Sequence, residues 1–463
     1  MLEKNERNKM IYSNNDRKKP KTVAFHTLGC KVNSYETEGM QRLFRDAGFE
    51  IFDFDDIADI YVVNTCTVTN LADRKSRQML HKAKKLNKDA IVVAAGCYVQ
   101  TSTNKTENIE DAVDLIVGNN HKQDIVKIVR QYMDDKLENK HEYVLDISKV
   151  DEFEELGIET ISEKTRASIK IQDGCNQFCS YCIIPYARGR VRSRKIDSVI
   201  KEVEKLTENN YKEVVLTGIH VSSYGIDFDD NLDKTPKLLE LILELSKIKG
   251  LERIRLSSLE PRIITEEFAK TLSSNSKLCP HFHLSLQSGC DETLKRMNRK
   301  YTTTEYREKC DLLRKHFKNP AITTDVIVGF PGETKEEYNM SAKFAEEIDF
   351  SQMHIFKYSI RKGTVAEKLA GQVDNKTKKM RSRSLIELAE KMKKKYMSSF
   401  VDKLEKVLVE EVTQINGRKY NLGHNERYVK IAFEADEDLS NQIVSVKVKE
   451  NLTNDIMIGV LQE

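Results

Sequence analysis

The sequence predicts an α/β protein that ends in a small all-β domain. Two separate series of strands alternate with helices, which is typical of parallel sheets, and short β-rich runs follow from about residue 398. A chain of 463 residues is too long for one ordinary domain, because a domain takes roughly 150 residues. Hydrophobic residues make up 39% of the chain, which is enough to build buried cores.

The first α/β series follows a basic segment, residues 1–21, which we expect to be a disordered tail. Strands are predicted at 22–28, 57–64, 91–95 and 115–117, and helices at 34–47 and 73–86. This alternation predicts a Rossmann-like N-terminal domain over residues 22–140. Residues 141–164 are acidic and lack periodicity, and are therefore predicted to be a linker.

The second series is longer and predicts a different α/β architecture. Strands are predicted at 167–171, 213–218, 253–257, 283–287, 323–329 and 352–358, with helices at 198–208, 237–246, 265–272, 303–316 and 335–347. Six βα units predict a barrel or a partial barrel over residues 165–397, whose chemistry should lie at the C-terminal ends of its strands.

The β-rich runs at the end of the chain predict a third domain over residues 398–463. They lie at 407–412, 428–433, 443–448 and 455–460, a spacing typical of a small β-barrel. Some barrels of this kind bind nucleic acid.

Composition indicates the compartment. Residues 1–21 contain no apolar stretch of about 7–15 residues, as a secretory signal would, and the best apolar run, 91–99, is far shorter than the roughly 20 residues of a membrane span. We therefore expect a cytoplasmic protein without a membrane partner. In a reducing compartment the nine cysteines favour metal or redox chemistry over disulfides.

Charge is unevenly distributed although the net charge is only +3. Residues 1–21 and 376–395 are rich in Lys and Arg, and residues 188–195 hold five cations without an acidic residue. Such blocks favour a polyanionic partner. A solvated helix face is the alternative for the two longer blocks.

Three cysteines form a compact motif directly after the first strand of the second series. Cys175, Cys179 and Cys182 have C-x3-C-x2-C spacing, short enough for one loop to surround one metal cluster. A structural zinc site and a plain electron-transfer cluster each use four ligands, whereas three cysteines on a cubane leave one iron open. Zinc with a distant fourth ligand, and thiols without a metal, remain alternatives.

A second trio lies in the first series, where Cys30, Cys66 and Cys97 each end or follow a predicted strand. Because the C-terminal strand ends of a doubly wound sheet converge on one crevice, a second three-ligand site is predicted there. Buried small hydrophobes are the alternative. The remaining three cysteines have no ligand spacing and are predicted to be core or surface thiols.

From about Thr22 onward the chain resembles the radical-SAM methylthiotransferase family. The most specific matches are GCNQFCSYCIIPYARGRVRSR at 174–194, TGIH at 217–220, SLEP at 258–261, LSLQSG at 284–289 and DVIVGFPGET at 325–334. The resemblance implies a partial (βα)6 radical-SAM barrel and identifies the last domain as similar to the OB-like TRAM module.

The same resemblance implies two [4Fe-4S] clusters and S-adenosyl-L-methionine (SAM). Cys175, Cys179 and Cys182 would hold the cluster whose open iron binds SAM and cleaves it to a 5′-deoxyadenosyl radical. The other trio would hold an auxiliary cluster that takes part in sulfur delivery. Strand-end candidates for contact with SAM are Thr217, Gly218, Ser257, Gln287 and Gly329, with plain strand-end packing as the alternative. An electron donor such as flavodoxin or ferredoxin is expected.

The family has three branches that differ in substrate. Around Cys30 the sequence continues Lys31-Val32-Asn33, which resembles the branch acting on N6-threonylcarbamoyladenosine in tRNA. The isopentenyladenosine branch tends to read Gly-Cys-Gln-Met-Asn, and the branch that modifies an aspartate of a ribosomal protein has Lys directly before Asn.

We therefore expect the anticodon stem-loop of tRNA as partner, and no DNA. Phosphate contacts are predicted for four arginines of the basic loop, namely Arg188, Arg190, Arg192 and Arg194. The other two branches remain alternatives, and so does a non-catalytic, zinc-containing RNA-binding protein.

Overall fold

A computed structural model describes residues 21–101, 109–135, 141–157, 165–233 and 235–462. The predicted basic tail, residues 1–21, lies outside them apart from Lys21. The chain divides into two compact units. Unit 1 comprises residues 1–158 and 183–190, and unit 2 comprises residues 159–182 and 191–463. Each unit is described by itself.

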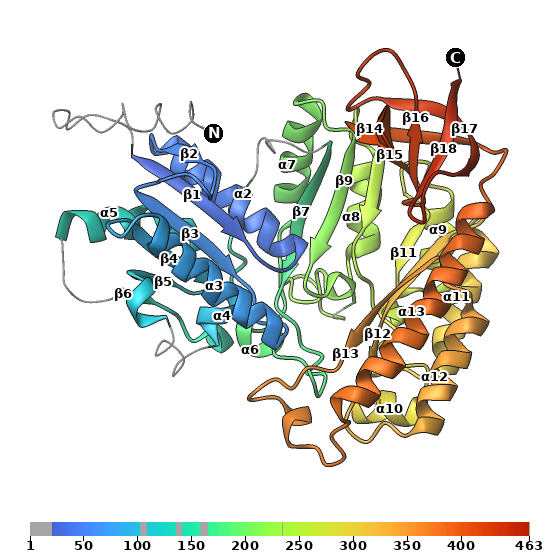
Figure 1. Ribbon diagram of the computed structural model, residues 1–463, viewed down its shortest axis with the longest axis horizontal. Coiled ribbons are helices and arrows are strands. Elements are labelled where there is room, and N and C mark those ends of the chain that lie inside the picture. Colours follow the sequence, from blue (N-terminus) through green and yellow to red (C-terminus); the bar gives the residue numbers. More distant parts are fainter. Residues whose placement is uncertain (1–20, 102–108, 136–140, 158–164, 234, 463) are drawn as a thin grey trace. The chain divides into compact units, whose positions relative to one another are not determined.

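Unit 1 contains a six-stranded sheet in the order β2-β1-β3-β4-β5-β6 (Figure 1), and every pair of neighbours is parallel. The strands are β1 (Thr22–Thr27), β2 (Glu50–Phe52), β3 (Ile60–Thr65), β4 (Ile91–Gly96), β5 (Leu115–Val117) and β6 (His141–Tyr143). The helices are α2 (Lys31–Asp46), α3 (Asn70–Leu86), α4 (Cys97–Gln100), α5 (Ile125–Asp135) and, from the returning segment, α6 (Ile184–Arg188).

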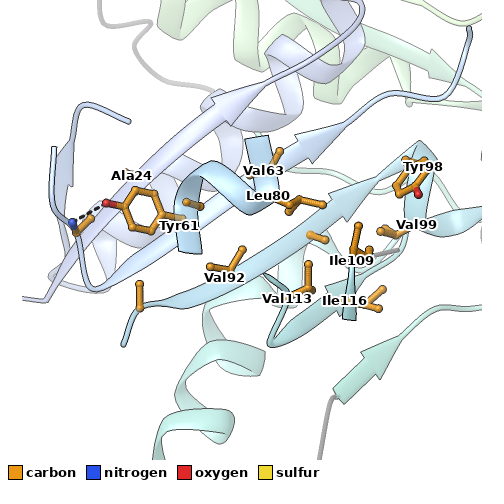
Figure 2. Close-up of a cluster of buried hydrophobic side chains, with 14 residues drawn as sticks. Ala24, Tyr61, Val63, Leu80, Val92, Tyr98, Val99, Ile109, Val113 and Ile116 are labelled. Carbon is orange, nitrogen blue, oxygen red and sulfur yellow. Dashed lines mark hydrogen bonds between the residues drawn. The ribbon is translucent and has the colours of Figure 1, made fainter. Parts of the chain in front are cut away.

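Both faces of this sheet are buried, as expected for parallel strands covered by helices. One core cluster includes Tyr61, Val63, Leu80 and Val92 (Figure 2). Within it the hydroxyl of Tyr61 accepts a hydrogen bond of 3.1 Å from the backbone N–H of Ala58. A second cluster includes strand residues such as Val62 and Val93, whose side chains alternate with those of the first. The alternation lets β3 and β4 pack against helices on both sides.

The predicted linker at 141–164 is wrong where the structure describes it. His141–Tyr143 extends the sheet as β6, paired with β5. Farther along, Arg42 on α2 donates to the carbonyl of Leu156 at 2.8 Å, and Glu154 accepts from the backbone N–H of Gln123 at 3.0 Å. Backbone pairing and polar contacts hold this segment in place. Neither requires regularly spaced hydrophobic residues, so the sequence showed no periodicity there.

Unit 2 begins with the predicted partial barrel, whose strands are β7 (Arg166–Asp173), β8 (Arg192–Ser193), β9 (Glu213–Gly218), β10 (Arg253–Leu256), β11 (His281–His283), β12 (Ala321–Val328) and β13 (Gln352–Lys357). They form the sheets β10-β9-β7-β8 and β11-β12-β13, which isolated parallel bridges such as Leu259–Leu284 connect. The helices are α7 (Ile196–Glu208), α8 (Leu238–Ser246), α9 (Glu266–Ser273), α10 (Asp291–Arg296), α11 (Thr303–His316), α12 (Lys335–Ile348) and α13 (Asn375–Ser398). Six parallel strands result, with β8 antiparallel to β7.

The fourth strand of the series differs from its prediction. The sequence predicts a strand at 283–287, but β11 ends at His283. Gln287 has a φ of +68°, a backbone conformation that strands do not adopt. Its backbone N–H still donates to the carbonyl of Asp325 at 2.9 Å, and an isolated bridge joins it to Val326, so this segment continues beside β12 irregularly.

Local signals explain several helix starts. Thr302 and Thr334 form capping boxes with Glu305 and Glu337, at the start of α11 and α12, and each box satisfies two backbone groups that a helix terminus leaves open. Asp374 accepts from the backbone N–H groups of two residues at the start of α13.

The end of unit 2 is a closed barrel in the order β14-β15-β16-β18-β17 (Figure 1). Its strands are β14 (Leu404–Ile415), β15 (Arg418–Asn425), β16 (Lys430–Phe433), β17 (Ile443–Asn451) and β18 (Ile456–Gln462). The sequence analysis missed β15, because RKYNLGHN lacks the β-branched residues typical of strands.

One tyrosine anchors this barrel to the strands of the partial barrel. The guanidinium groups of Arg166 and Arg255 each lie 4.9 Å from the centre of the Tyr428 ring, and His424 stacks on that ring at 4.4 Å. Arg255 also pairs with Glu213 at 2.7 Å. Buried cation–π contacts of this kind contribute about 1–2 kcal/mol each.

Candidate functional site

The C-x3-C-x2-C loop follows the C-terminal end of β7. Gly174 and Phe178 have positive φ values of 69° and 48°, and these turns fold the loop back on itself. The backbone N–H of Cys182 donates to the carbonyl of Cys179 at 2.9 Å. Ser180 fixes the loop from outside, since its N–H donates to the carbonyl of Met297 at 3.0 Å. The three thiols are thus presented by one short, anchored turn.

Hydrogen-bond donors point at the sulfur atoms of this loop. The N–H of Gln177 lies 3.4 Å from Cys175 Sγ, and Arg299 Nη1 lies 3.2 Å from Cys179 Sγ. Burial raises the pKa of the Cys175 thiol to about 11, and the hydrogen bond from Gln177 opposes that rise. Donors of this kind stabilise thiolate ligands, so the loop fits a thiolate-bound iron-sulfur cluster.

The five positions predicted to contact SAM lie at strand ends of the same unit. Thr217 and Gly218 close β9, Ser257 follows β10, and Gly329, with a φ of +71°, follows β12. Gln287 lies in the irregular segment after β11. A side chain at Gly218 would lie 2.9 Å from the carbonyl oxygen of Gln172, so only glycine fits there without a shift.

Two buried polar atoms at this rim have no hydrogen-bond partner among the described residues. They are Ser257 Oγ and His220 Nε2. Burial lowers the pKa of His220 to about 4, and its other ring nitrogen lies 2.6 Å from Ser223 Oγ. Buried polar groups are normally satisfied, so this rim fits a polar ligand. Sequence analysis did not single out His220, although it lies in the TGIH motif.

The second trio is built in unit 1 from three neighbouring strands. Cys30 is the N-cap of α2, Cys66 follows β3 directly, and Cys97 is the first residue of α4 after β4. Cys66 and Cys97 are buried, whereas Cys30 is exposed. Burial raises the pKa of Cys66 to about 11, and negative charge on Cys97 and Cys30 would raise it further. The sheet therefore brings the three thiols within electrostatic reach of one another.

Close packing shapes this sulfur-lined end of the sheet. Gly29 has a φ of +104°, and a Cβ there would lie 2.8 Å from Cys66 Sγ. The side-chain amide of Asn119 lies 3.6 Å from Cys97 Sγ. Glycine at position 29 therefore leaves room for Cys66 Sγ, and Asn119 offers a hydrogen-bond donor to Cys97 Sγ.

A buried charge network lies directly behind this trio. Glu36 on α2 accepts from Arg188 at 2.8 and 3.0 Å, and it also pairs with Lys122. Arg188 donates to Asn33 Oδ1 at 2.7 Å, and Lys122 donates to Asn119 Oδ1 at 2.7 Å. The network connects α2, the segment that holds Asn119 and Lys122, and α6, and so fixes residues beside Cys30 and Cys97. Sequence analysis missed it because the Glu36 partners lie 86 and 152 residues away.

Three of the four arginines predicted to contact phosphate are buried, which corrects that prediction. Arg188 belongs to the network above, Arg192 lies 3.7 Å from Asp173, and Arg194 pairs with Glu202. Their relative exposures are 0%, 1% and 3%. Of the four, only Arg190 is exposed. The local Arg content that suggested a surface patch serves internal carboxylates instead.

The remaining thiols, Cys279, Cys290 and Cys310, are all buried. Burial raises the pKa of Cys279 and of Cys310 to about 12. They are core residues, which is one of the two locations, core or surface, predicted for them.

Family models match two parts of the chain. Residues 169–345 match the model described as the Radical SAM superfamily. Residues 22–118 match the model described as uncharacterized protein family UPF0004.

Curated proteins are similar over most of their length. The threonylcarbamoyladenosine tRNA methylthiotransferase MtaB of Bacillus subtilis (strain 168) is 42% identical over 92% of this chain and 93% of its own length. The protein of the same name from Aquifex aeolicus (strain VF5) is 41% identical over 86% of this chain and 95% of its own. The tRNA-2-methylthio-N(6)-dimethylallyladenosine synthase of Acetivibrio thermocellus is 33% identical over 93% of this chain and 89% of its own.

Among solved structures, the radical S-adenosylmethionine methyltransferase TsrM of Kitasatospora setae, with cobalamin and a [4Fe-4S] cluster bound, has a similar fold. The TM-score is 0.55 at 17% identity, over 73% of this chain and 75% of that one.

Proposed function

We propose that this chain, which belongs to the radical-SAM methylthiotransferase family, converts N6-threonylcarbamoyladenosine of tRNA to its 2-methylthio derivative. The supporting observation is a difference in identity. Four relatives named for the threonylcarbamoyladenosine reaction are 34–42% identical to this chain, whereas four named for the dimethylallyladenosine reaction are 32–33% identical. Lys31 and Val32 after Cys30 agree with that branch.

Membership of the family makes the chain an enzyme that uses SAM and [4Fe-4S] clusters, and it sets aside the non-catalytic zinc protein. We assign one cluster to Cys175, Cys179 and Cys182, and the auxiliary cluster to Cys30, Cys66 and Cys97. When bound, the first cluster and SAM supply a radical that can remove hydrogen from an unactivated carbon.

The protein's own groups position these partners. Gln177 and Arg299 direct N–H groups at the sulfurs of the first trio. At the strand-end rim, Ser257 Oγ and the neutral His220 offer hydrogen bonds that no other described group uses. In unit 1 the buried Glu36 network connects α2, which begins directly after Cys30, with Asn119, whose side-chain amide lies 3.6 Å from Cys97 Sγ. Pre-organised groups of this kind reduce the reorganisation that a reaction requires.

Contact with tRNA is assigned to exposed cations. Arg190 is exposed, and so are Lys376, Lys379 and Arg383 on α13. Lys378 and Arg381 of the same helix are buried, and Arg381 pairs with Glu333 at 2.6 Å. The basic segment is thus partly structural, and its exposed half is available for phosphates of the anticodon stem.

A flavodoxin or ferredoxin is the proposed electron donor, and the cytoplasm is the proposed location. No helix within the described residues is long and apolar enough to cross a membrane.

The test is nucleoside analysis of tRNA from a strain that lacks this chain. We expect 2-methylthio-N6-threonylcarbamoyladenosine to disappear, to return with the wild-type chain, and to stay absent with Cys175→Ala. Methylthiolated isopentenyladenosine should not change in any of these strains. An unchanged amount of the first nucleoside, or a loss of the second alone, would refute the substrate assignment.

A further inference from the structure

Two histidines and an aspartate come together on one face of the partial barrel in unit 2. His283 lies on β11, Asp325 on β12 and His354 on β13. Thr323 is the register partner of His283, and Asp325 is the partner of His354. Side chains alternate along a strand, so the residue before each ligand points to the opposite face. These preceding residues, Phe282, Thr324 and Met353, are all buried.

The ligand atoms of the three side chains all lie within 4.8 Å of one another. His283 Nε2 lies 3.3 Å from Asp325 Oδ2, and His283 Nδ1 lies 2.9 Å from Thr323 Oγ1. When Nδ1 donates to Thr323, Nε2 keeps a lone pair directed toward the carboxylate. A second hydrogen bond that orients a histidine in this way is typical of metal-binding imidazoles.

The 3.3 Å separation between His283 Nε2 and Asp325 Oδ2 is longer than a charge-assisted hydrogen bond. Hydrogen bonds between a cationic N–H and a carboxylate measure about 2.7–2.9 Å, and His283 Nε2 has no hydrogen-bond partner among the described residues. Two ligands at about 2.0–2.1 Å from a tetrahedral zinc ion stand about 3.3–3.4 Å apart. The observed distance matches the edge of a metal tetrahedron.

We propose that His283, Asp325 and His354 bind one divalent transition-metal ion, such as Zn²⁺. Two imidazoles and one carboxylate are a ligand set that such ions use when a further position is open. The site shares no ligand with either cysteine trio, and it does not rest on the proposed tRNA substrate.

A cavity lies beside one of the three ligands, His354. His354, Gln352 and Phe356 line a space of about 1010 Å³ between β13, α13 and the turn between β17 and β18. Lys391, Lys393 and Lys394 of α13 line the cavity. Lys393 is the lysine whose charge acts on His354, and it pairs with Asp455. Its charge is thereby offset, and the open position of the metal would take water or a ligand oxygen from the cavity.

The experiment uses the full-length chain with its clusters reconstituted and loosely bound iron removed. Zn²⁺ is titrated against a chromophoric chelator. We expect about one equivalent bound by the wild type, and binding at least about tenfold weaker for Asp325→Asn and for His354→Gln. Thr323→Val removes only the partner of Nδ1 and should weaken binding about 10–100-fold, the usual effect of such partners.

His316→Gln is the matched control. His316 Nε2 lies 2.8 Å from Glu266 Oε1 in a pair that has no third ligand among the described residues, so zinc binding should stay at the wild-type value. Equal affinity in the wild type and in Asp325→Asn would overturn the proposal, and so would an equal loss in His316→Gln.

X-ray absorption at the zinc edge tests the wild type without relying on a variant. Nitrogen and oxygen ligands at about 2.0–2.1 Å support the site, whereas sulfur at about 2.3 Å would place zinc on cysteines and refute it.

Discussion

The two cysteine trios reach similar chemistry by different routes. Cys175, Cys179 and Cys182 lie within one loop after β7, whereas Cys30, Cys66 and Cys97 come from the ends of three adjacent strands, β1, β3 and β4. Of the two hydrogen-bond donors to the sulfurs of the loop trio, Gln177 belongs to the loop itself and Arg299 comes from farther along the chain. The strand-end trio depends on the sheet order and on the buried Glu36–Arg188–Lys122 network.

This difference separates what spacing can encode from what a fold must supply. A loop of a few residues can present its ligands with little help, because few backbone angles determine their separation. Ligands from separate strands are positioned only when the strands are paired in the right register. The loop trio should therefore tolerate changes elsewhere in the chain better than the strand-end trio.

The largest expected effect comes from removing a ligand of the loop trio. Cys175→Ala should abolish cleavage of SAM to 5′-deoxyadenosine, and the iron content should fall to about half, since a cubane held by two cysteines is poorly retained. Chromatography of the deoxyadenosine and iron analysis measure both. Continued cleavage at the wild-type rate would show that this trio does not hold the SAM-cleaving cluster.

Removing a ligand of the strand-end trio should separate the two activities. Cys66→Ala is expected to lose methylthiolation and about half of the iron, but to retain SAM cleavage, because the loop trio is intact. Product nucleoside and deoxyadenosine are measured in the same reaction. If Cys66→Ala still forms the methylthio product at full rate, the assignment of the auxiliary cluster is wrong.

A smaller effect is expected at Gly29, beside Cys66. Gly29→Ala adds strain of about 1–2 kcal/mol at positive φ, together with a contact of 2.8 Å to Cys66 Sγ. Iron should be lost from the auxiliary cluster only. Gly48→Ala is the control, because Gly48 has a φ of +87° and no atom within 4 Å of its added Cβ.

Thermal unfolding and iron analysis of the two glycine variants test whether the effect of Gly29→Ala is local to the auxiliary cluster. Both should lose stability through backbone strain, Gly29→Ala more because of its contact with Cys66 Sγ, but only Gly29→Ala should lose iron. Equal iron loss in both variants would contradict a local effect on the trio.

The smallest effect concerns the donor to Cys179. Arg299→Gln removes a positive charge 3.2 Å from the sulfur, so the reduced, more negative cluster is less stabilised. Its midpoint potential should fall by on the order of tens of millivolts, and Arg299→Lys should restore part of the shift. Potentiometric titration followed by electron paramagnetic resonance measures this.

Arg296→Gln is the control for that experiment. Arg296 pairs with Glu337 at 3.0 Å, and the structure gives it no hydrogen bond to a cluster thiol among the described residues. An equal shift of potential in both variants would mean that overall charge, and not the contact with Cys179, determines it.

Sequence alone predicted the elements whose causes are local. The alternating series located most strands and helices, since buried faces repeat at short periods. The C-x3-C-x2-C loop could be identified because its ligands lie within eight positions of one another. The placement of Cys30, Cys66 and Cys97 at strand ends followed from the same pattern, once parallel strands were assumed.

Tertiary structure decided the features that depend on pairing over long distances. The sequence of the basic loop predicted Arg188 to be a surface cation. In the structure it is buried and pairs with Glu36, 152 residues earlier, because a buried carboxylate needs charged partners. His283, Asp325 and His354 lie on three strands and become neighbours only through strand register. Local sequence sets which elements form, but the packing of sheets decides which side chains meet.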